Sequence, residues 1–182
     1  MSRVAMRRHV RGFTLVELMI TMAVALVLIM IAVPSFRTMT LSNKLTTTVN
    51  DMVGAINLAR VESVKRNANV QFCSNLAASN TTDPLGAACG TQTGAVIAMA
   101  GTVAQPVGTG TVDLVDPLQL SGNVKAIRFG GQGLGYAIGA TGPYTGLVAD
   151  ICTSGMSSNN HRQINMTAGS IIVTTTTSGT CP

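Results

Sequence analysis

The stretch Arg11-Gly-Phe-Thr-Leu-Val-Glu-Leu-Met-Ile-Thr21 decides how this chain is organised. It contains the end of a basic leader, which stops at Gly12, and the start of an apolar run that begins at Phe13 and carries one acid, Glu17. The run stays almost entirely apolar as far as Val33. About 20 helical residues cross a hydrocarbon layer of about 30 Å, so the run predicts a membrane-spanning helix with one charge left inside it.

That charge needs a cationic partner. An acid near the bilayer interior costs on the order of 2.5 to 3.5 kcal/mol on insertion scales, so an unpaired Glu17 would be unfavourable. The nearest basic residues, Arg8 and Arg11, both precede Gly12. Cleavage after Gly12 would give Phe13 a new α-amino group. This group would then be the cation for Glu17, in the same subunit or in a neighbouring one.

The arrangement resembles the class III signal of type IV prepilins and type II secretion pseudopilins. The basic leader and the residues from Gly12 to Glu17 match that motif position by position. The resemblance implies that a prepilin peptidase cuts after Gly12 and methylates the amine of Phe13, and that Glu17 pairs with the amine of the next subunit during assembly. The alternatives are an ordinary secretory signal peptide cut after Ala25 and an uncleaved signal anchor. A glutamate inside the apolar region argues against the first.

Most of the net charge lies in the leader. Four of the twelve basic residues are Arg3, Arg7, Arg8 and Arg11, and without them eight basic residues face seven acidic ones. The mature chain is therefore almost neutral, and the basic leader mainly sets topology by staying in the cytoplasm. The 182 residues allow one domain beyond the anchor.

Four cysteines follow the apolar run, at positions Cys73, Cys89, Cys152 and Cys181. An even number on the far side of the membrane predicts two disulfides in an oxidising periplasm, and four cysteines allow three pairings. We favour pairing of nearest neighbours, which would close one small loop and fasten the C-terminus to a strand. A zinc site is the competing interpretation. No Cys-x-x-Cys spacing exists and only His161 remains after cleavage, so we expect no metal and no cofactor.

A second helical pattern follows the apolar run. Pro34 removes one backbone hydrogen bond, so we expect a kink or local melting there, with a true helix end as the alternative. Glu62 and Arg66 are four residues apart and can pair on the surface. A coiled coil with another protein is the alternative use of the apolar stripe. That stripe is formed by Leu41, Leu45, Val49, Val53, Ile56 and Val64.

Beyond Arg66 the sequence changes to short runs with β character, separated by turn residues. The runs cover residues 70–73, 95–99, 124–129, 147–152, 163–167 and 170–175. They predict an antiparallel sheet, with Ala168-Gly169 as a hairpin between the last two runs. The glycine-rich segments 130–135 and 139–146 are interpreted as turns, because they lack a Gly-Lys-Ser/Thr sequence and open no amphipathic helix.

This layout resembles the pilin fold. Two patches, Leu58–Arg66 continuing to Val70–Cys73 and His161–Ser170 continuing to Cys181, look like the GspH/FimT/FimU group of minor pilins and pseudopilins. The resemblance implies an α+β, pilin-like fold. Its long N-terminal helix would have a transmembrane half and an amphipathic half, packed on a C-terminal antiparallel β-sheet head.

Four segments follow from these patterns. We place a cleaved leader at residues 1–12, a transmembrane and filament-core helix at 13–34, an amphipathic helix at 35–66, and a β-rich periplasmic head with two disulfides at 67–182. The chain would sit in the bacterial inner membrane as a single-pass protein and then enter a filament.

The sequence argues against catalysis, because the mature chain offers one histidine, four cysteines expected in disulfides and seven scattered acids. We predict a structural minor pilin or pseudopilin whose partners are prepilin peptidase, the inner membrane and other major and minor pilins or pseudopilins. The ending with its final cysteine looks closer to a pilus subunit. The alternative is a pilus-tip receptor for DNA. Nucleic acid is disfavoured because Lys125 and Arg128 are the only basic pair in the sheet region, and several cations are needed to neutralise phosphates.

Overall fold

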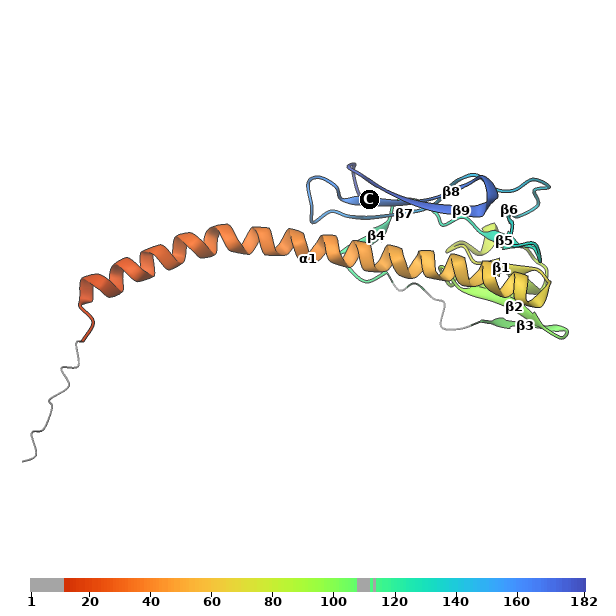
Figure 1. Ribbon diagram of the computed structural model, residues 1–182, viewed down its shortest axis with the longest axis horizontal. Helices are drawn as coiled ribbons and strands as arrows, with labels where there is room; N and C mark the ends of the chain where they lie inside the picture. Colours follow the sequence, from red (N-terminus) through yellow and green to blue (C-terminus); the bar gives the residue numbers. More distant parts are fainter. Residues whose placement is uncertain (1–11, 108–111, 113) are drawn as a thin grey trace, which may run out of the picture. The chain divides into compact units, whose positions relative to one another are not determined.

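The computed structural model describes residues 12–107, 112 and 114–182, and the predicted leader before Gly12 lies outside them. The chain divides into two compact units, one ending at Met39 and the other comprising Thr40–Pro182. One long helix, α1 (Leu15–Arg66), contributes residues to both units (Figure 1). The units are therefore described separately.

The first unit is helix with no core. Every described residue from Gly12 to Met39 is exposed, including the large apolar side chains. The sequence at Leu15–Arg66 is long and apolar enough, by length and composition, to cross a membrane. The helix continues through Pro34, so the predicted melting and the alternative helix end are both wrong. A bend at this proline stays a prediction.

The second unit uses α1 as an amphipathic helix with one buried face. Its buried members recur at the three- and four-residue spacing of one helix face. They are Leu45, Val49, Met52, Ala55, Ile56, Ala59, Glu62 and Ser63. The predicted stripe is therefore right in its middle and wrong at its end, because Val64 is 52% exposed while Ala59 and Ser63 continue the buried face.

The ion pair at the end of α1 also differs from the prediction of a surface contact. The Glu62 side chain is only 9% exposed and accepts hydrogen bonds from Arg66 Nε at 2.8 Å and Lys65 Nζ at 3.2 Å. These two cations, Arg66 first, lower the pKa of Glu62 below its usual value. The carboxylate is compensated in place at the rim of the core.

The head is built from antiparallel strands, as predicted, and these strands form two sheets where one was expected. The five-stranded sheet has the order β3-β2-β1-β5-β6, and its strands are β1 (Val70–Phe72), β2 (Val96–Ala100), β3 (Val103–Pro106), β5 (Ile127–Phe129) and β6 (Gly135–Ala137). The four-stranded sheet has the order β4-β7-β8-β9, and its strands are β4 (Leu118–Leu120), β7 (Gly146–Thr153), β8 (His161–Thr167) and β9 (Ile171–Thr177). Every strand pair is antiparallel.

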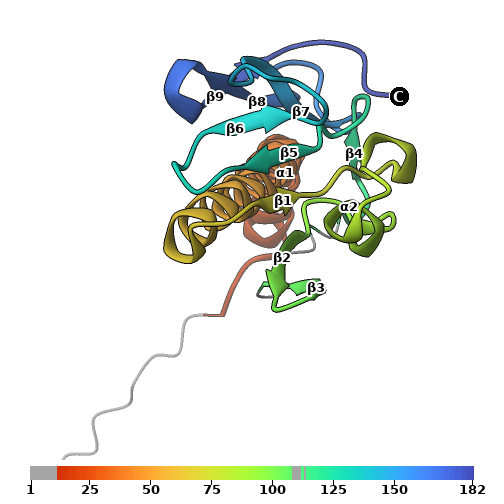
Figure 2. The same cartoon turned by 90° about the vertical axis from the view of Figure 1, so that its right-hand side faces the viewer.

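The hydrophobic core lies between the buried face of α1 and the two sheets. Phe72 and Phe129 are fully buried there, together with Ile164 and Met166 from β8. In Figure 2, β1 and β5 pass across α1, while β7, β8 and β9 form the neighbouring layer. Burying this apolar surface is what holds the head on the second half of the helix.

Strand β1 is buried on both of its faces. A short helix, α2 (Pro84–Cys89), lies against β1, β2 and β3, and its Leu85 clusters with Ile97 of β2 apart from the main core. The helix begins where Asp83 accepts a hydrogen bond from Gly86 N at 2.9 Å, with Pro84 in the first turn. Both residue types are typical of a helix start. Helix α2 was not predicted, although Asp83-Pro84 was an available signal for a helix start.

Strands β3, β4 and β6, of three or four residues each, were missed as well. The glycine-rich segments form turns as predicted in their interiors, while Gly135 begins β6 and Gly146 begins β7. The hairpin at Ala168-Gly169 is confirmed: a short helical turn joins β8 to β9, and Gly169 has φ 76°, which suits a residue without Cβ.

Candidate functional site

The predicted assembly residues lie at the start of α1. Gly12 and Phe13 precede the helix, and the Phe13 side chain is 78% exposed. Thr14 caps the helix, since its Oγ1 accepts a hydrogen bond from Glu17 N at 3.2 Å and its carbonyl accepts one from Leu18 N at 3.1 Å. Thr14 and Glu17 have the spacing of a capping box, which was not predicted.

Only the threonine half of that capping box is formed. The Glu17 carboxylate makes no ion pair or side-chain hydrogen bond with any residue that the structure describes. It stands in the first turn, where the helix dipole favours an anion by a few tenths of a kcal/mol to about 1 kcal/mol. This local stabilisation is smaller than the cost of placing the charge in hydrocarbon.

All four predicted disulfide cysteines are bonded. Cys73, directly after β1, is joined to Cys89 at the end of α2, with a Cα–Cα distance of 5.5 Å. Cys152 in β7 is joined to Cys181 in the C-terminal segment, with a Cα–Cα distance of 5.7 Å. The structure therefore has the nearest-neighbour pairing. The first bridge holds α2 on the sheet, and the second returns the chain end to β7.

A cluster of polar side chains connects α2 with the five-stranded sheet. Arg128 on β5 forms a two-pronged ion pair with Asp83, at 2.5 Å from Nη1 to Oδ2 and 3.0 Å from Nη2 to Oδ1. Its Nη2 also donates to Thr81 Oγ1 at 2.8 Å and to the side-chain oxygen of Gln71. The guanidinium, assisted by Thr81 and Gly86 N, holds the pKa of Asp83 well below its usual range.

This cluster changes the interpretation of the basic pair Lys125 and Arg128 in the sheet region. The Arg128 charge is compensated by Asp83, and its side chain is only 21% exposed. Lys125 stays exposed, with Nζ 5.7 Å from the centroid of the Tyr144 ring. Burial raises the pKa of Tyr144. A protein that neutralises phosphates needs several free cations, and this pair supplies one.

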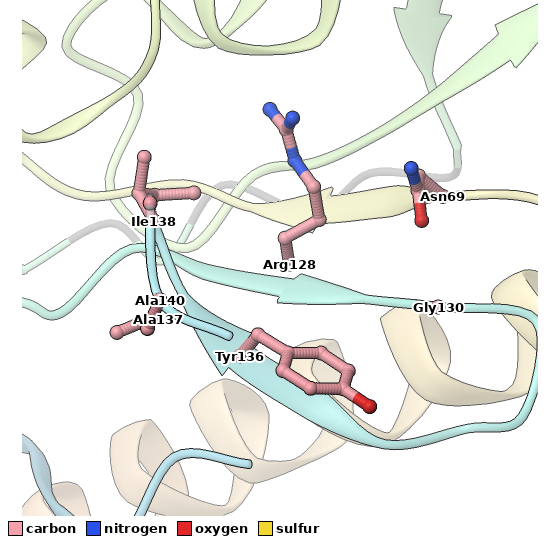
Figure 3. A pocket seen from close by; sticks show the side chains of 8 residues that line it. Asn69, Arg128, Gly130, Tyr136, Ala137, Ile138 and Ala140 are labelled. Carbon is pink, nitrogen blue, oxygen red and sulfur yellow. The ribbon is translucent and has the colours of Figure 1, made fainter. Parts of the chain in front are cut away.

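A small pocket lies on the same part of the sheet (Figure 3). Its volume is about 180 Å³, and its lining includes Asn69, Arg128 and Tyr136. Figure 3 shows the Arg128 guanidinium pointing away from the Tyr136 ring. Pockets for drug-sized ligands are typically about 300 to 1,000 Å³, so this one is too small for most of them, and its lining contains no acid, histidine or cysteine.

The one histidine of the described chain is buried in the four-stranded sheet. His161 Nδ1 lies 3.1 Å from each carboxylate oxygen of Asp150, and Gln163 Nε2 donates to the same carboxylate at 3.2 Å. His161 Nε2 is buried without a hydrogen-bond partner among the described residues. A ring enclosed in this way cannot reach a substrate, so the contact ties β7 to β8. This contact was not predicted, because Asp150 and His161 are eleven residues apart and meet only through strand pairing.

No group of three or more potential metal ligands comes together in the described parts of the chain. The feature that the head does not account for is the exposed apolar first part of α1, which carries Glu17 in its first turn.

Comparison with protein families gave two matches. Residues 7–33 match the prokaryotic N-terminal methylation motif, and residues 48–170 match the type II transport protein GspH family. The first match includes the predicted cleavage position, and the second begins in α1 and ends just before β9. Comparison with curated proteins and with solved structures gave no match.

Proposed function

Because this chain belongs to the type II transport protein GspH family, whose members are structural pilins and pseudopilins, we propose that it is a minor subunit of a type IV pilus or of a type II secretion pseudopilus. The methylation motif implies processing by prepilin peptidase and assembly with other pilins or pseudopilins. In this proposal the peptidase cuts after Gly12 and methylates the new amine of Phe13. The processed chain then enters the filament.

The observation that carries the proposal is the first half of α1. Its apolar side chains are exposed all round, with values of 45% or more for every large one from Leu15 to Val33. A helix that is apolar on every face requires lipid or other apolar helices around it. The same segment can therefore serve two environments in turn, first the inner membrane and then the centre of a filament.

Glu17 is the one charged residue in the apolar segment from Phe13 to Val33, and it can therefore define how neighbouring helices align. Its carboxylate has no partner among the described residues, and leaving a buried charge uncompensated costs about 3 to 5 kcal/mol. The amine of Phe13 in a neighbouring subunit can remove that cost only when the two helices are in one register. We propose that this pairing sets the position of each helix in the filament.

The head occupies the periplasm in this scheme. Two disulfides suit an oxidising compartment, and the basic leader keeps the opposite end of the chain in the cytoplasm. We favour the pilus over the pseudopilus because the C-terminal segment ending at Cys181 looks closer to pilus subunits. The proposed role needs no catalytic residue and no cofactor.

The test is to identify the first residue of the purified protein and then remove the acid. Mass spectrometry should find an N-methylated Phe13 as the first residue; any other start contradicts the proposal. Glu17→Ala should leave insertion and cleavage intact and lower incorporation into sheared filaments. Glu17→Asp, which keeps the charge, is the matched control and should retain more incorporation. Normal filament recovery from Glu17→Ala would overturn the role assigned to this carboxylate.

A further inference from the structure

The end of the chain, residues 178–182, forms a strap across the four-stranded sheet. These residues follow β9, adopt neither helix nor strand, and return to β7 through the Cys152–Cys181 disulfide. Figure 2 shows the segment leaving β9 and arcing back over the sheet to the end of the chain. The position of the strap therefore depends on a few side-chain contacts and on one covalent bond.

Two asparagines just before β8 hold the strap by hydrogen bonds. Asn160 Nδ2 donates to Gly179 O at 2.9 Å, and Asn160 Oδ1 accepts from Gly179 N at 3.1 Å. Asn159 N donates to Ser178 Oγ at 2.8 Å. The Asn160 carboxamide thus takes the place that a neighbouring strand would have beside Gly179. These three hydrogen bonds can open locally while β7, β8 and β9 remain paired.

The two disulfides of the head differ in how deeply their cysteines are buried. Cys73 and Cys89 are completely buried in the smaller hydrophobic cluster. Cys152 is completely buried as well, whereas Cys181 in the strap is half-buried. An attacking thiolate must reach a sulfur atom, so access decides which disulfide exchanges readily. Cys181 is therefore the cysteine at which attack is least hindered.

A buried nitrogen under the strap lacks a partner while the disulfide is closed. His161 lies directly opposite Cys152 on the paired strands, and such residues share one face of the sheet with their Cβ atoms about 4.5 to 5.5 Å apart. The His161 side chain is 6% exposed, and Nε2 has no hydrogen-bond partner among the described residues. This nitrogen faces the strap, since a Cβ at Gly179 would lie 3.2 Å from it. An unpaired buried polar atom is unfavourable.

Reduction of Cys152 would supply the missing partner. His161 Nδ1 lies 3.1 Å from both carboxylate oxygens of Asp150, so this nitrogen carries a proton. A neutral ring then has a lone pair at Nε2, to which a Cys152 thiol can donate. A protonated ring has an N–H there, which a Cys152 thiolate can accept. The reduced cysteine therefore satisfies Nε2 in either protonation state, whereas the disulfide has no hydrogen to donate.

We propose that the Cys152–Cys181 disulfide is a thiol-exchange site, opened by a thiol–disulfide exchange protein of the periplasm. A thiolate of that protein attacks Cys181 Sγ and forms a mixed disulfide with it. The bond to Cys152 breaks, its electron pair stays on the Cys152 sulfur, and water supplies the proton. A second thiol of the exchange protein then resolves the mixed disulfide, which leaves Cys181 reduced and the exchange protein oxidised. The reverse steps close the strap.

Partial reduction of the purified, detergent-solubilised full chain tests the proposal, with reduced glutathione as the attacking thiol. Alkylation and peptide mass spectrometry should show that Cys152–Cys181 opens at least about tenfold faster than Cys73–Cys89, because access differs. Glutathione should be found on Cys181 in the mixed disulfide. Protease resistance of the head checks that the fold survives. Equal rates for the two disulfides, or glutathione found on Cys152, would overturn the proposal.

Asn160→Ala tests the attachment of the strap. The variant removes two of the three hydrogen bonds, so the strap should leave the sheet more often and the reduction rate at Cys181 should rise about threefold or more. Asn165→Ala is the matched control, since this asparagine lies on β8 and its Nδ2 reaches Thr175 Oγ1 at 3.5 Å, outside the strap. The control should leave the rate unchanged within error. Equal rates for Asn160→Ala and the parent would contradict the proposed opening.

His161→Asn tests the nitrogen under the strap. Asparagine can still donate to Asp150 from near the position of Nδ1, but it has no atom at the position of Nε2. The equilibrium constant for reduction by glutathione should fall about fivefold or more, because the open strap no longer gains a hydrogen bond. An unchanged constant would overturn the role given to His161. The partner's periplasmic location rests on the proposed function, whereas exchange with glutathione is measured on the purified chain, so its failure is separate from that of the Glu17 test.

Discussion

Leu28 and Leu45 are the same residue type on one helix, yet Leu28 is 62% exposed and Leu45 is completely buried. The first belongs to a unit that has no core, and the second belongs to a unit with two sheets and two disulfides. The contrast shows that α1 is stabilised in two ways. Its second half is held by packing within its own chain, while its first half must receive its apolar surroundings from outside, from lipid or from other helices.

The largest expected effect concerns cleavage after Gly12, which would remove the leader from the first unit. Gly12→Glu should abolish processing completely, because the bulky acid replaces the residue at which the peptidase must approach the backbone closely. A Cβ at this position would meet nothing within 4 Å, so the substitution itself does not disturb the fold. Gel mobility and intact mass of the membrane-bound protein measure the outcome. An unchanged mature fraction would show that cleavage does not occur after Gly12.

Truncation of the two leucines separates the halves of α1 energetically. Leu45→Ala should lower the free energy of unfolding of the head by about 2 to 5 kcal/mol, since it leaves a cavity in the core. Leu28→Ala should leave head stability unchanged within error, because this side chain is 62% exposed and belongs to the other unit. Pulse proteolysis of the detergent-solubilised full chain across a urea series measures both variants. Equal losses would contradict the division of the helix into two roles.

The disulfides give the next effect in size. Replacing Cys73 and Cys89 by serine should destabilise the head by about 2 to 4 kcal/mol, because the unfolded chain is freed from a loop closed over a sequence separation of 16. The same proteolysis assay applies, and fractionation should show that membrane insertion is unaffected. A loss of insertion would mean that the two units are less independent than the comparison implies.

The sequence was sufficient for the features that depend on composition over long segments. The apolar run from Phe13 and the stripe through Leu45 and Val49 predicted both halves of α1, since hydrophobic periodicity over many residues is a strong signal. The hairpin at Ala168-Gly169 was predictable because its turn chemistry is local. The strands β7, β8 and β9 are long enough for a residue pattern to show, and their predicted ends agree with the structure to within two residues.

Features that depend on contacts between distant residues could not be read from the sequence. Arg128 meets Asp83 across 45 positions, so nothing near either residue indicates that the charge is compensated. His161 meets Asp150 only because β7 pairs with β8. The burial of Glu62 was missed because an acid near a helix end is usually exposed, while here two adjacent cations let it face the core. The partner of Glu17 lies beyond a single chain and stays a prediction.

The smallest effect is expected from the Asp83–Arg128 pair, which joins α2 to the sheet. Arg128 lowers the pKa of Asp83, so the folded state binds this proton more weakly than the unfolded chain does. The pair's stabilisation is therefore fully present above about pH 4, the usual pKa of an aspartate, and is lost as the pH falls below it. Because the Asp83 side chain is 39% exposed, solvent screens the pair and the effect at neutral pH should be at most about 1 kcal/mol.

Asp83→Asn measures this contribution directly, since asparagine can still cap α2 while it removes the charge. The variant should be slightly less stable than the parent at pH 7, and the two should converge as the pH approaches 3. Leu28→Ala is a suitable control, because that residue lies in the other unit and its effect should not change with pH. A difference between parent and Asp83→Asn that grew on acidification would show that the ion pair does not hold α2 on the sheet.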